Sequence, residues 1–176
     1  MSVTEAQADV RRLYSGGFQG QLVSAVIWLS AAAAAQWSST TSAVVVLVLG
    51  GTLIVPLTWF VIRLTGRPAS LPPGHPMAAL AMQIAFTVPI GLVVVVALLS
   101  GHGELFFPAS MVVVGAHYLP FVFLYGMRLF AYLAAALVVP GVLLLVWVPA
   151  PVALGGWLTA VVLAVFAFLL RASADA

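Results

Sequence analysis

His117 is the residue of this sequence best placed to do chemistry, because it is the one histidine inside a long apolar stretch, which extends from Phe106 to Tyr125. An imidazole can bind a ligand, transfer a proton or ligate a metal, and it can also simply form a hydrogen bond to a neighbouring helix. The sequence leaves ligand binding or proton handling open beside plain hydrogen bonding. Metal or haem ligation is the weaker interpretation, since no second His lies in another apolar stretch to share a metal. We therefore predict neither a metal site nor a cofactor.

Polar groups in the other apolar stretches are further candidate functional residues, since a polar side chain in hydrocarbon is costly unless it is paired. Gln83 and Thr87 lie four residues apart, so they share one face of a helix. The predicted ligand-binding residues are His117, Gln83, Thr87, Thr52, Trp59 and Tyr125. The candidate acid and base residues are His117, Tyr118 and Tyr125. For each of these residues, hydrogen bonding between helices is the alternative interpretation.

Several chemistries are excluded by residue types that the apolar stretches lack. These stretches contain no Asp, Glu or Lys, so a carboxylate proton relay, an aspartyl intramembrane protease or an acid-initiated cyclase would lack its essential group. The chain has no Cys, which rules out disulfides and thiolate chemistry. Outside the stretches, His102 and Glu104 offer two donors where zinc takes four. A turn is sufficient to explain His75, which lies in a Pro-Pro-Gly-His-Pro loop.

The elements that position these residues must be membrane-spanning helices. Of the 176 residues, 64% are hydrophobic and 6% are charged, against about 25% charged in an average soluble domain. A soluble fold of this size could not hide that much apolar surface, so lipid is the solvent of this chain. The net charge of +2 gives no argument for nucleic-acid binding.

Six apolar runs are long enough to cross a bilayer, for which a helix needs about 20 residues. They extend over residues 21–37, 43–64, 77–99, 106–125, 129–147 and 152–170. The predicted fold class is therefore all-α, a polytopic transmembrane bundle of six spans. Spans two to five each contain a proline, namely Pro56, Pro89, Pro120 and Pro140. Because proline frees a backbone carbonyl, these helices either bend or line a central cavity.

The arginines predict the orientation of the spans. With six spans, all six basic residues fall on one side of the membrane: Arg11, Arg12, Arg63, Arg67, Arg128 and Arg171. With five spans, Arg171 would fall on the other side. Since Arg accumulates in cytoplasmic loops, we predict that both termini are cytoplasmic. The richness in Ala, Val and Leu is typical of a GC-rich bacterial genome, which makes the inner membrane of a bacterium the predicted location.

Residues 1–20 are the most polar part of the chain and predict a short amphipathic helix at the membrane interface. Ser2 and Glu5 have the spacing of a capping box, and Gly16 and Gly17 end the helix. Apolar residues recur at helical intervals opposite the charged ones. The predicted organisation is thus an interfacial segment over 1–20, a six-helix membrane domain over 21–170 and a cytoplasmic tail over 171–176.

Small residues in the sixth span predict close packing. Gly156, Ala160 and Ala164 repeat at intervals of four residues, a pattern that lets helix backbones approach. This ridge is expected to pack against another helix or against a second copy of the chain. Spans one and six are therefore predicted to be packing walls, and spans two to five to form the site.

Two segments resemble a known family. They are Arg-Leu-Tyr-Ser-Gly-Gly-Phe-Gln-Gly-Gln-Leu-Val-Ser-Ala-Val-Ile-Trp over residues 12–28 and Gly-Ala-His-Tyr-Leu-Pro-Phe-Val-Phe-Leu-Tyr over residues 115–125. Both are similar to segments of a family of small, uncharacterised bacterial six-span membrane proteins. The resemblance implies no activity, but it gives Gly115, His117, Pro120 and Tyr125 added weight.

Three functions agree with these observations. The first is binding or transport of a neutral or weakly polar small molecule between spans two and five near His117. The second is an intramembrane enzyme that acts on a lipid or isoprenoid, with His117 as acid or base. The third is a structural or accessory subunit of a larger membrane complex. The predicted partners are membrane lipid, a small-molecule ligand and a second copy of the chain.

Overall fold

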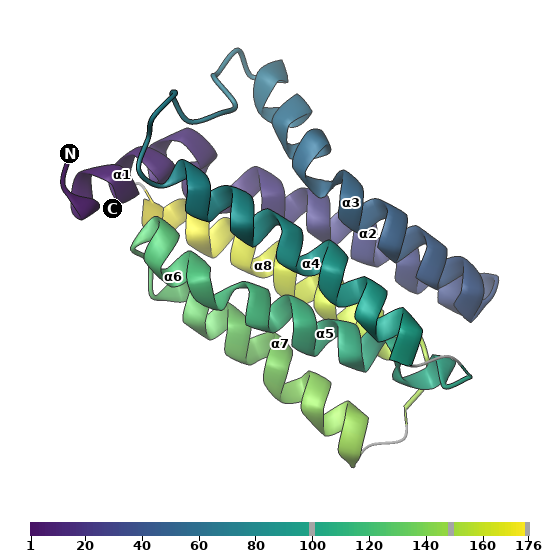
Figure 1. Ribbon diagram of the computed structural model, residues 1–176. Helices are drawn as coiled ribbons and strands as arrows, with labels where there is room; N and C mark the ends of the chain where they lie inside the picture. Colours follow the sequence, from purple (N-terminus) through teal and green to yellow (C-terminus); the bar gives the residue numbers. More distant parts are fainter. Residues whose placement is uncertain (99–100, 148–149, 175–176) are drawn as a thin grey trace.

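The computed structural model describes residues 1–98, 101–147 and 150–174, and these residues form a bundle of α-helices (Figure 1). Within the described ranges, six helical stretches are long and apolar enough to cross a membrane. The all-α, six-span fold class is therefore confirmed. Both termini lie at the same end of the bundle (Figure 1), as an even number of spans requires.

The helices follow the predicted spans closely. Their bounds are α1 Val3–Tyr14, η1 Ser15–Gly17, α2 Phe18–Trp37, α3 Thr40–Leu64, α4 Ala78–Leu98, η2 Gly103–Leu105, α5 Phe106–His117, α6 Leu119–Tyr125, α7 Leu129–Val146 and α8 Leu154–Ala174. The predicted last residue of the third span, Leu99, lies outside the described residues, as do residues 175–176 of the predicted tail. Residues 171–174 of that tail continue α8.

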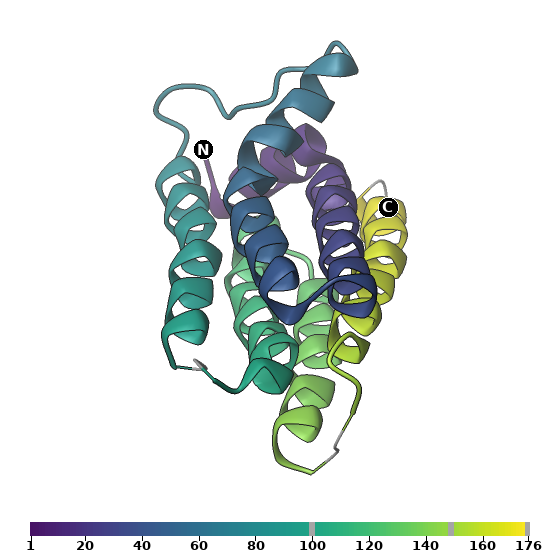
Figure 2. The same cartoon turned by 90° about the vertical axis from the view of Figure 1, so that its right-hand side faces the viewer.

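Two sets of helices pack closely in this bundle. α2 packs most extensively against α3 and α8, and α5 packs against α7. By contrast α3 and α4 touch less, and the end of α3 near residue 64 stands away from α4 in two views at right angles (Figures 1 and 2). The bundle is therefore tight along α2, α8, α5 and α7, and looser between α3 and α4.

The small-residue ridge of α8, formed by Gly156, Ala160 and Ala164, contacts other helices of the same chain. A Cβ atom at Gly156 would lie 2.8 Å from Cε1 of Phe107 and 2.9 Å from Cβ of Ala32, so α8 approaches α5 and α2 closely there. Ala160 is 3% exposed. At Gly156 and Ala160 the ridge thus packs against other helices of the same chain, and a contact with a second copy stays a prediction.

α1 forms the predicted amphipathic helix and has the predicted cap. The Ser2 side chain accepts a hydrogen bond from the Glu5 N–H, and the Glu5 carboxylate accepts one from the Ser2 N–H. Ala6 and Val10 are fully buried, so the apolar face of α1 packs on the bundle. Gly16 has a φ of 66°, and a Cβ there would lie 2.6 Å from the carbonyl oxygen of Leu170. The turn after α1 therefore requires glycine both for its conformation and for its contact with α8.

Polar contacts fix α1 across the end of the bundle. Gln7 Nε2 donates to the carbonyl of Phe123, and Arg11 Nη1 donates to that of Tyr125, each at 2.6 Å. These carbonyls belong to the last turn of α6, where the regular helical partners are missing; the Phe123 carbonyl also accepts from the Gly126 N–H at 3.3 Å. In the loop between α3 and α4, Arg67 donates to Ser15 Oγ at 2.7 Å.

The same end of the bundle gathers the basic residues, and we call it the arginine end. Arg11 and Arg12 lie on α1, Arg63 lies in the last turn of α3, and Arg171 lies in the last turn of α8. The Arg171 guanidinium is 4.8 Å from the centre of the Phe18 ring at the start of α2. The helix order thus places the arginines on one side, as their spacing in the sequence predicts.

One of the four span prolines breaks its helix. The fourth span divides at Tyr118 into α5 and α6, and the Tyr118 N–H bonds the carbonyl of Gly115 at 3.1 Å. Pro120 lacks an N–H and cannot continue the α-helical ladder. The prolines of the other three spans stay inside the continuous helices α3, α4 and α7. The break therefore falls directly after His117.

Candidate functional site

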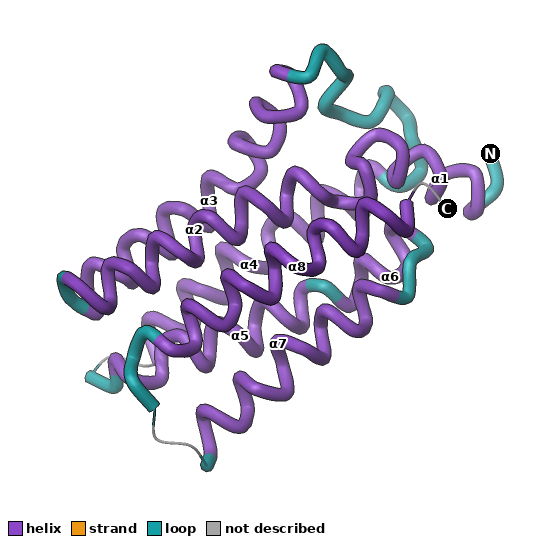
Figure 3. The backbone as a smooth tube through the Cα atoms, turned by 180° about the vertical axis from the view of Figure 1, so that it is seen from behind, coloured by secondary structure: helices purple, strands orange, loops and turns teal. Residues whose placement is uncertain are grey.

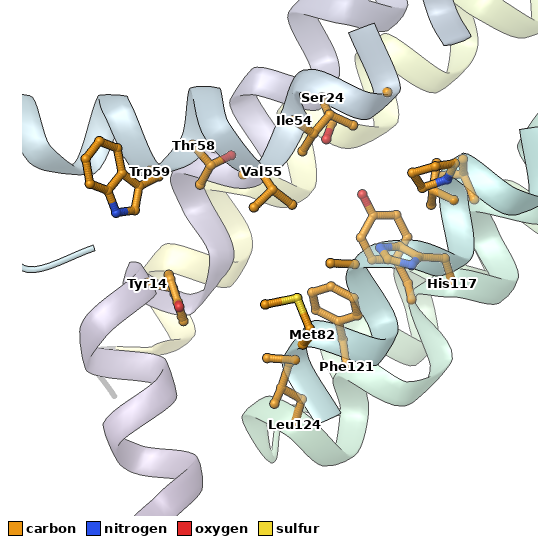
Figure 4. A pocket seen from close by; sticks show the side chains of 18 of the residues that line it. Tyr14, Ser24, Ile54, Val55, Thr58, Trp59, Met82, His117, Phe121 and Leu124 are labelled. Atoms are coloured by element: carbon orange, nitrogen blue, oxygen red, sulfur yellow. The ribbon is translucent and has the colours of Figure 1, made fainter. Parts of the chain in front are cut away.

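A cavity of about 520 Å³ lies at the loose side of the bundle, between α3 and α4. Its walls come from α2, α3, α4, α5 and α6, and residues 69–71 of the loop after α3 line it as well. Tyr14 of α1 also lines it (Figure 4). The volume is within the range of roughly 300–1,000 Å³ that encloses a small-molecule ligand.

The cavity differs from the predicted pocket between spans two and five in two of the helices that form its walls. Among the described residues that line the cavity none belongs to α7, the fifth span, whereas Gly20, Ser24 and Trp28 of the first span do. The reason is the close approach of α5 and α7. A Cβ at Gly115 would lie 3.0 Å from the carbonyl oxygen of Ala134, and one at Gly141 would lie 3.1 Å from that of Pro108. No space is left between these helices, so the cavity forms on the other face of α5.

His117 lines the cavity, and a neighbouring helix fixes its ring. Nδ1 lies 2.6 Å from Thr87 Oγ1 on α4. The Thr87 hydroxyl donates its own proton to the carbonyl of Ile84 at 2.8 Å, so it accepts from Nδ1–H of the imidazole. The Ile84 carbonyl also lies beside the ring, on the side of Nδ1. In the neutral ring the other nitrogen, Nε2, is then an acceptor, and none of the hydrogen bonds found among the described residues involves it. His117 therefore offers one hydrogen-bond acceptor to a ligand.

Tyr118 and Tyr125, the candidate acid and base residues, also line the cavity. Both are buried, at 4% and 5% exposed. The Tyr118 hydroxyl donates to Gln21 Oε1 on α2 at 3.1 Å, which occupies its proton. The Tyr125 ring stacks on Phe121 at a centroid distance of 5.6 Å. Aromatic side chains therefore form the wall of the cavity at α6, and the Tyr118 hydrogen bond links this wall to α2.

The other predicted ligand-binding residues divide into two groups. Trp59 lines the cavity and carries the Arg63 guanidinium 4.7 Å from its ring centre. Thr87 does not line the cavity but holds the His117 ring through the hydrogen bond to Nδ1. Gln83 and Thr52 are exposed and do not line the cavity, and the Thr52 hydroxyl donates to the carbonyl of Leu49 in its own helix. On α4 the neighbouring residue Met82 lines the cavity instead, because one residue turns a helix by about 100°.

Several residues of the site were missed because the first span was predicted to be only a packing wall. Gln21, Ser24 and Trp28 are buried on α2, and their spacing of three and four residues places them on one helix face. That stripe of an amide, a hydroxyl and an indole was the available signal. Thr58 of α3 was missed as well. Its Oγ1 is buried without a hydrogen-bond partner, opposite Gly20 of α2.

His75 has more contacts than a turn residue needs. Its ring is buried, and Nδ1 accepts a hydrogen bond from the Met77 N–H at 3.2 Å. Nε2 lies 3.7 Å from a carboxylate oxygen of Asp9 on α1. His75 therefore helps to attach the loop before α4 to α1, at the arginine end of the cavity. No group of three or more His, Cys, Asp or Glu side chains that could hold a metal ion occurs in residues 1–98, 101–147 and 150–174.

Seen from behind, the described chain is helical throughout its spans except at the break between α5 and α6 (Figure 3). The fold and the cavity together define a class: a six-span α-helical membrane protein with a mostly apolar cavity on one side of the bundle. Over residues 3–173 the chain matches the model of a family described as a family of unknown function, DUF7010. The chain belongs to this family. No curated protein matches it, and no solved structure does.

Proposed function

We propose that this protein binds a neutral or weakly polar small molecule in the cavity between α3 and α4. The observation that carries the proposal is the cavity itself, about 520 Å³ in volume, with His117 on its wall. A mostly apolar pocket with a few placed polar groups is the usual form of a small-molecule site. Here the placed polar groups include the His117 imidazole, with Nε2 as its acceptor.

Native mass spectrometry of the purified protein tests the proposal. We expect a retained molecule in a ratio of one per chain. Ala85 lines the cavity, so Ala85→Phe should fill it and abolish retention. Ile90 lies on the same helix, is 62% exposed and does not line the cavity, so Ile90→Phe is the matched control and should retain the molecule. Retention that is equal in the two variants would contradict the proposal.

An intramembrane enzyme is the second candidate, and the orientation of His117 favours it. Its Nδ1 is held by Thr87, which leaves Nε2 free to accept a proton inside the cavity. For this function His117→Ala should abolish turnover of a lipid or isoprenoid while the fold remains intact. Lipid profiles that do not differ between cells with the wild type and cells with His117→Ala would exclude it. Binding remains the better supported function, because none of the described residues that line the cavity carries a carboxylate beside the imidazole.

The location follows as a further part of the proposal. The arginine end would face the cytoplasm, with both termini inside and the chain in the inner membrane of a bacterium, since Arg is retained on the cytoplasmic side. The chain has no Cys, so single cysteines can report topology. Ser70→Cys, in the loop at the arginine end, should resist an impermeant thiol reagent in intact cells, and Ser39→Cys at the other end should react. The reverse pattern would overturn this orientation.

A further inference from the structure

We propose that the ligand is a membrane-dissolved amphiphile with a single chain and an uncharged hydroxyl head group, which reaches the cavity sideways between α3 and α4. This inference rests on the proposed function and adds the chemical class of the ligand and its route.

The cavity opens toward lipid. Val55 and Trp59 of α3 and Met82 of α4 line it, yet they are 56%, 45% and 62% exposed. The surface next to the opening is also apolar, with Phe60 on α3 and Phe86 on α4 exposed. In a bundle whose solvent is lipid, a molecule that enters between these helices comes from the hydrocarbon layer. A strongly hydrated ligand would have to give up its water before it reached this opening.

The interior of the cavity accepts a hydrocarbon chain and rejects a charge. Trp28, Leu47, Leu92 and Val114 line it and are at most 4% exposed. No Asp, Glu, Lys or Arg lines it among the described residues. An ion without a partner is costly in such surroundings. The ligand is therefore uncharged where it touches these walls.

The polar groups of the walls match a hydroxyl. His117 lies on the cavity wall (Figure 4), and its Nε2 is a hydrogen-bond acceptor. A hydroxyl group both donates and accepts. A hydroxyl head group can thus donate its proton to His117 Nε2 and keep its oxygen as an acceptor. A ketone or an ester lacks the proton that His117 Nε2 requires.

The size of the cavity favours one chain. About 520 Å³ lies within the range of roughly 300–1,000 Å³ found for pockets that enclose one small molecule. A phospholipid has two chains and a charged head group, so both its bulk and its charge disagree with the cavity. At the arginine end, Tyr14 and Ser70 line the cavity. These two residues limit how far the hydrocarbon chain of a ligand can extend in that direction.

Trp28 provides the probe, because it lines the cavity and is only 2% exposed. The chain has five Trp, and a variant in which the other four are replaced by Phe reports on Trp28 alone. In lipid nanodiscs, dibrominated stearyl alcohol should quench the fluorescence of Trp28 saturably. Dibrominated phosphatidylcholine and dibrominated stearylamine at the same bromine content should not.

Variants of the single-Trp protein then locate the binding. Ala85→Phe should remove the saturable quenching, and Ile90→Phe should preserve it. If Ala85→Phe does not fold, Ala81→Phe fills the same cavity, since Ala81 also lines it. His117→Ala should weaken the apparent affinity roughly two- to tenfold, the range expected for one lost hydrogen bond.

Quenching by the amine that equals quenching by the alcohol would overturn the proposed head group. Equal quenching by the phospholipid, or quenching that Ala85→Phe does not change, would overturn the single-chain ligand in this cavity. If native mass spectrometry shows a retained water-soluble molecule and the alcohol does not quench, this inference fails while the proposed binding function stands. If nothing is retained and nothing quenches, both fail.

Discussion

Gly115 permits the contact between α5 and α7 that places the cavity on the other face of α5, and its replacement should measure that contact. A Cβ at this position would lie 2.6 Å from Cγ2 of Val138, 3.0 Å from the Ala134 carbonyl oxygen and 3.0 Å from the Val138 nitrogen. The valine methyl group can rotate, but the two backbone atoms cannot. Gly115→Ala therefore forces α5 and α7 apart by a few tenths of an ångström.

Two effects of opposite sign set the size of the change. Excess volume in a packed interior costs about 1–3 kcal/mol, and Ala is better than Gly within a helix by about 1 kcal/mol. We expect Gly115→Ala to lower the free energy of unfolding by about 1 kcal/mol and the branched Gly115→Val to lower it by about 2 kcal/mol or more. Gly20→Ala is the matched control, because its Cβ would meet only Thr58, at 3.7 Å.

Unfolding by sodium dodecyl sulfate in mixed micelles, followed by circular dichroism, gives the comparison. Gly20→Ala should equal the wild type or exceed it by up to about 1 kcal/mol. If Gly115→Ala is as stable as Gly20→Ala, α5 and α7 are not in close contact at Gly115. The reasoning that excludes a pocket on that side of α5 would then be refuted.

Three further predictions concern the polar contacts. Thr87→Val removes the acceptor for His117 Nδ1 and should lower ligand retention in native mass spectrometry by roughly two- to tenfold; unchanged retention would show that the ring needs no such support. Tyr118→Phe leaves the buried Gln21 amide without its donor and should cost about 1–3 kcal/mol in the same unfolding assay. Gln21→Leu in addition should recover part of this loss, and no recovery would count against the pair. Arg11→Ala leaves the Tyr125 carbonyl without its partner and should speed hydrogen exchange in α1. Arg12→Ala is the control, because Arg12 pairs with Asp9 of its own helix, and equal exchange in both variants would contradict the attachment of α1 to α6.

Hydrophobicity and charge were sufficient to predict the helices and the gathering of the arginines at one end. Span length follows from the thickness of the bilayer, and the position of Arg in the sequence places it beside one end of a span or the other. Both are local properties of the chain. The cap formed by Ser2 and Glu5 and the helix end at Gly16 could be predicted for the same reason.

The neighbours of each helix could not be predicted in this way. In lipid, helix pairs form where small residues let backbones approach, and a glycine in one helix does not indicate which helix it will meet. Gly115 and Gly141 allow α5 and α7 to pack closely. For the reason just given, their positions in the sequence did not indicate that span five lies outside the cavity. His117 and Thr87 do meet, as expected of scarce polar groups in hydrocarbon, whereas Thr52 satisfies its hydroxyl within its own helix.

The most direct test of the account is a high-resolution density map of the protein in lipid nanodiscs. The account predicts non-protein density in the cavity between α3 and α4, with a polar atom within hydrogen-bond distance of His117 Nε2. A map in which α3 and α4 close against each other, with no space and no density beside His117, would contradict it.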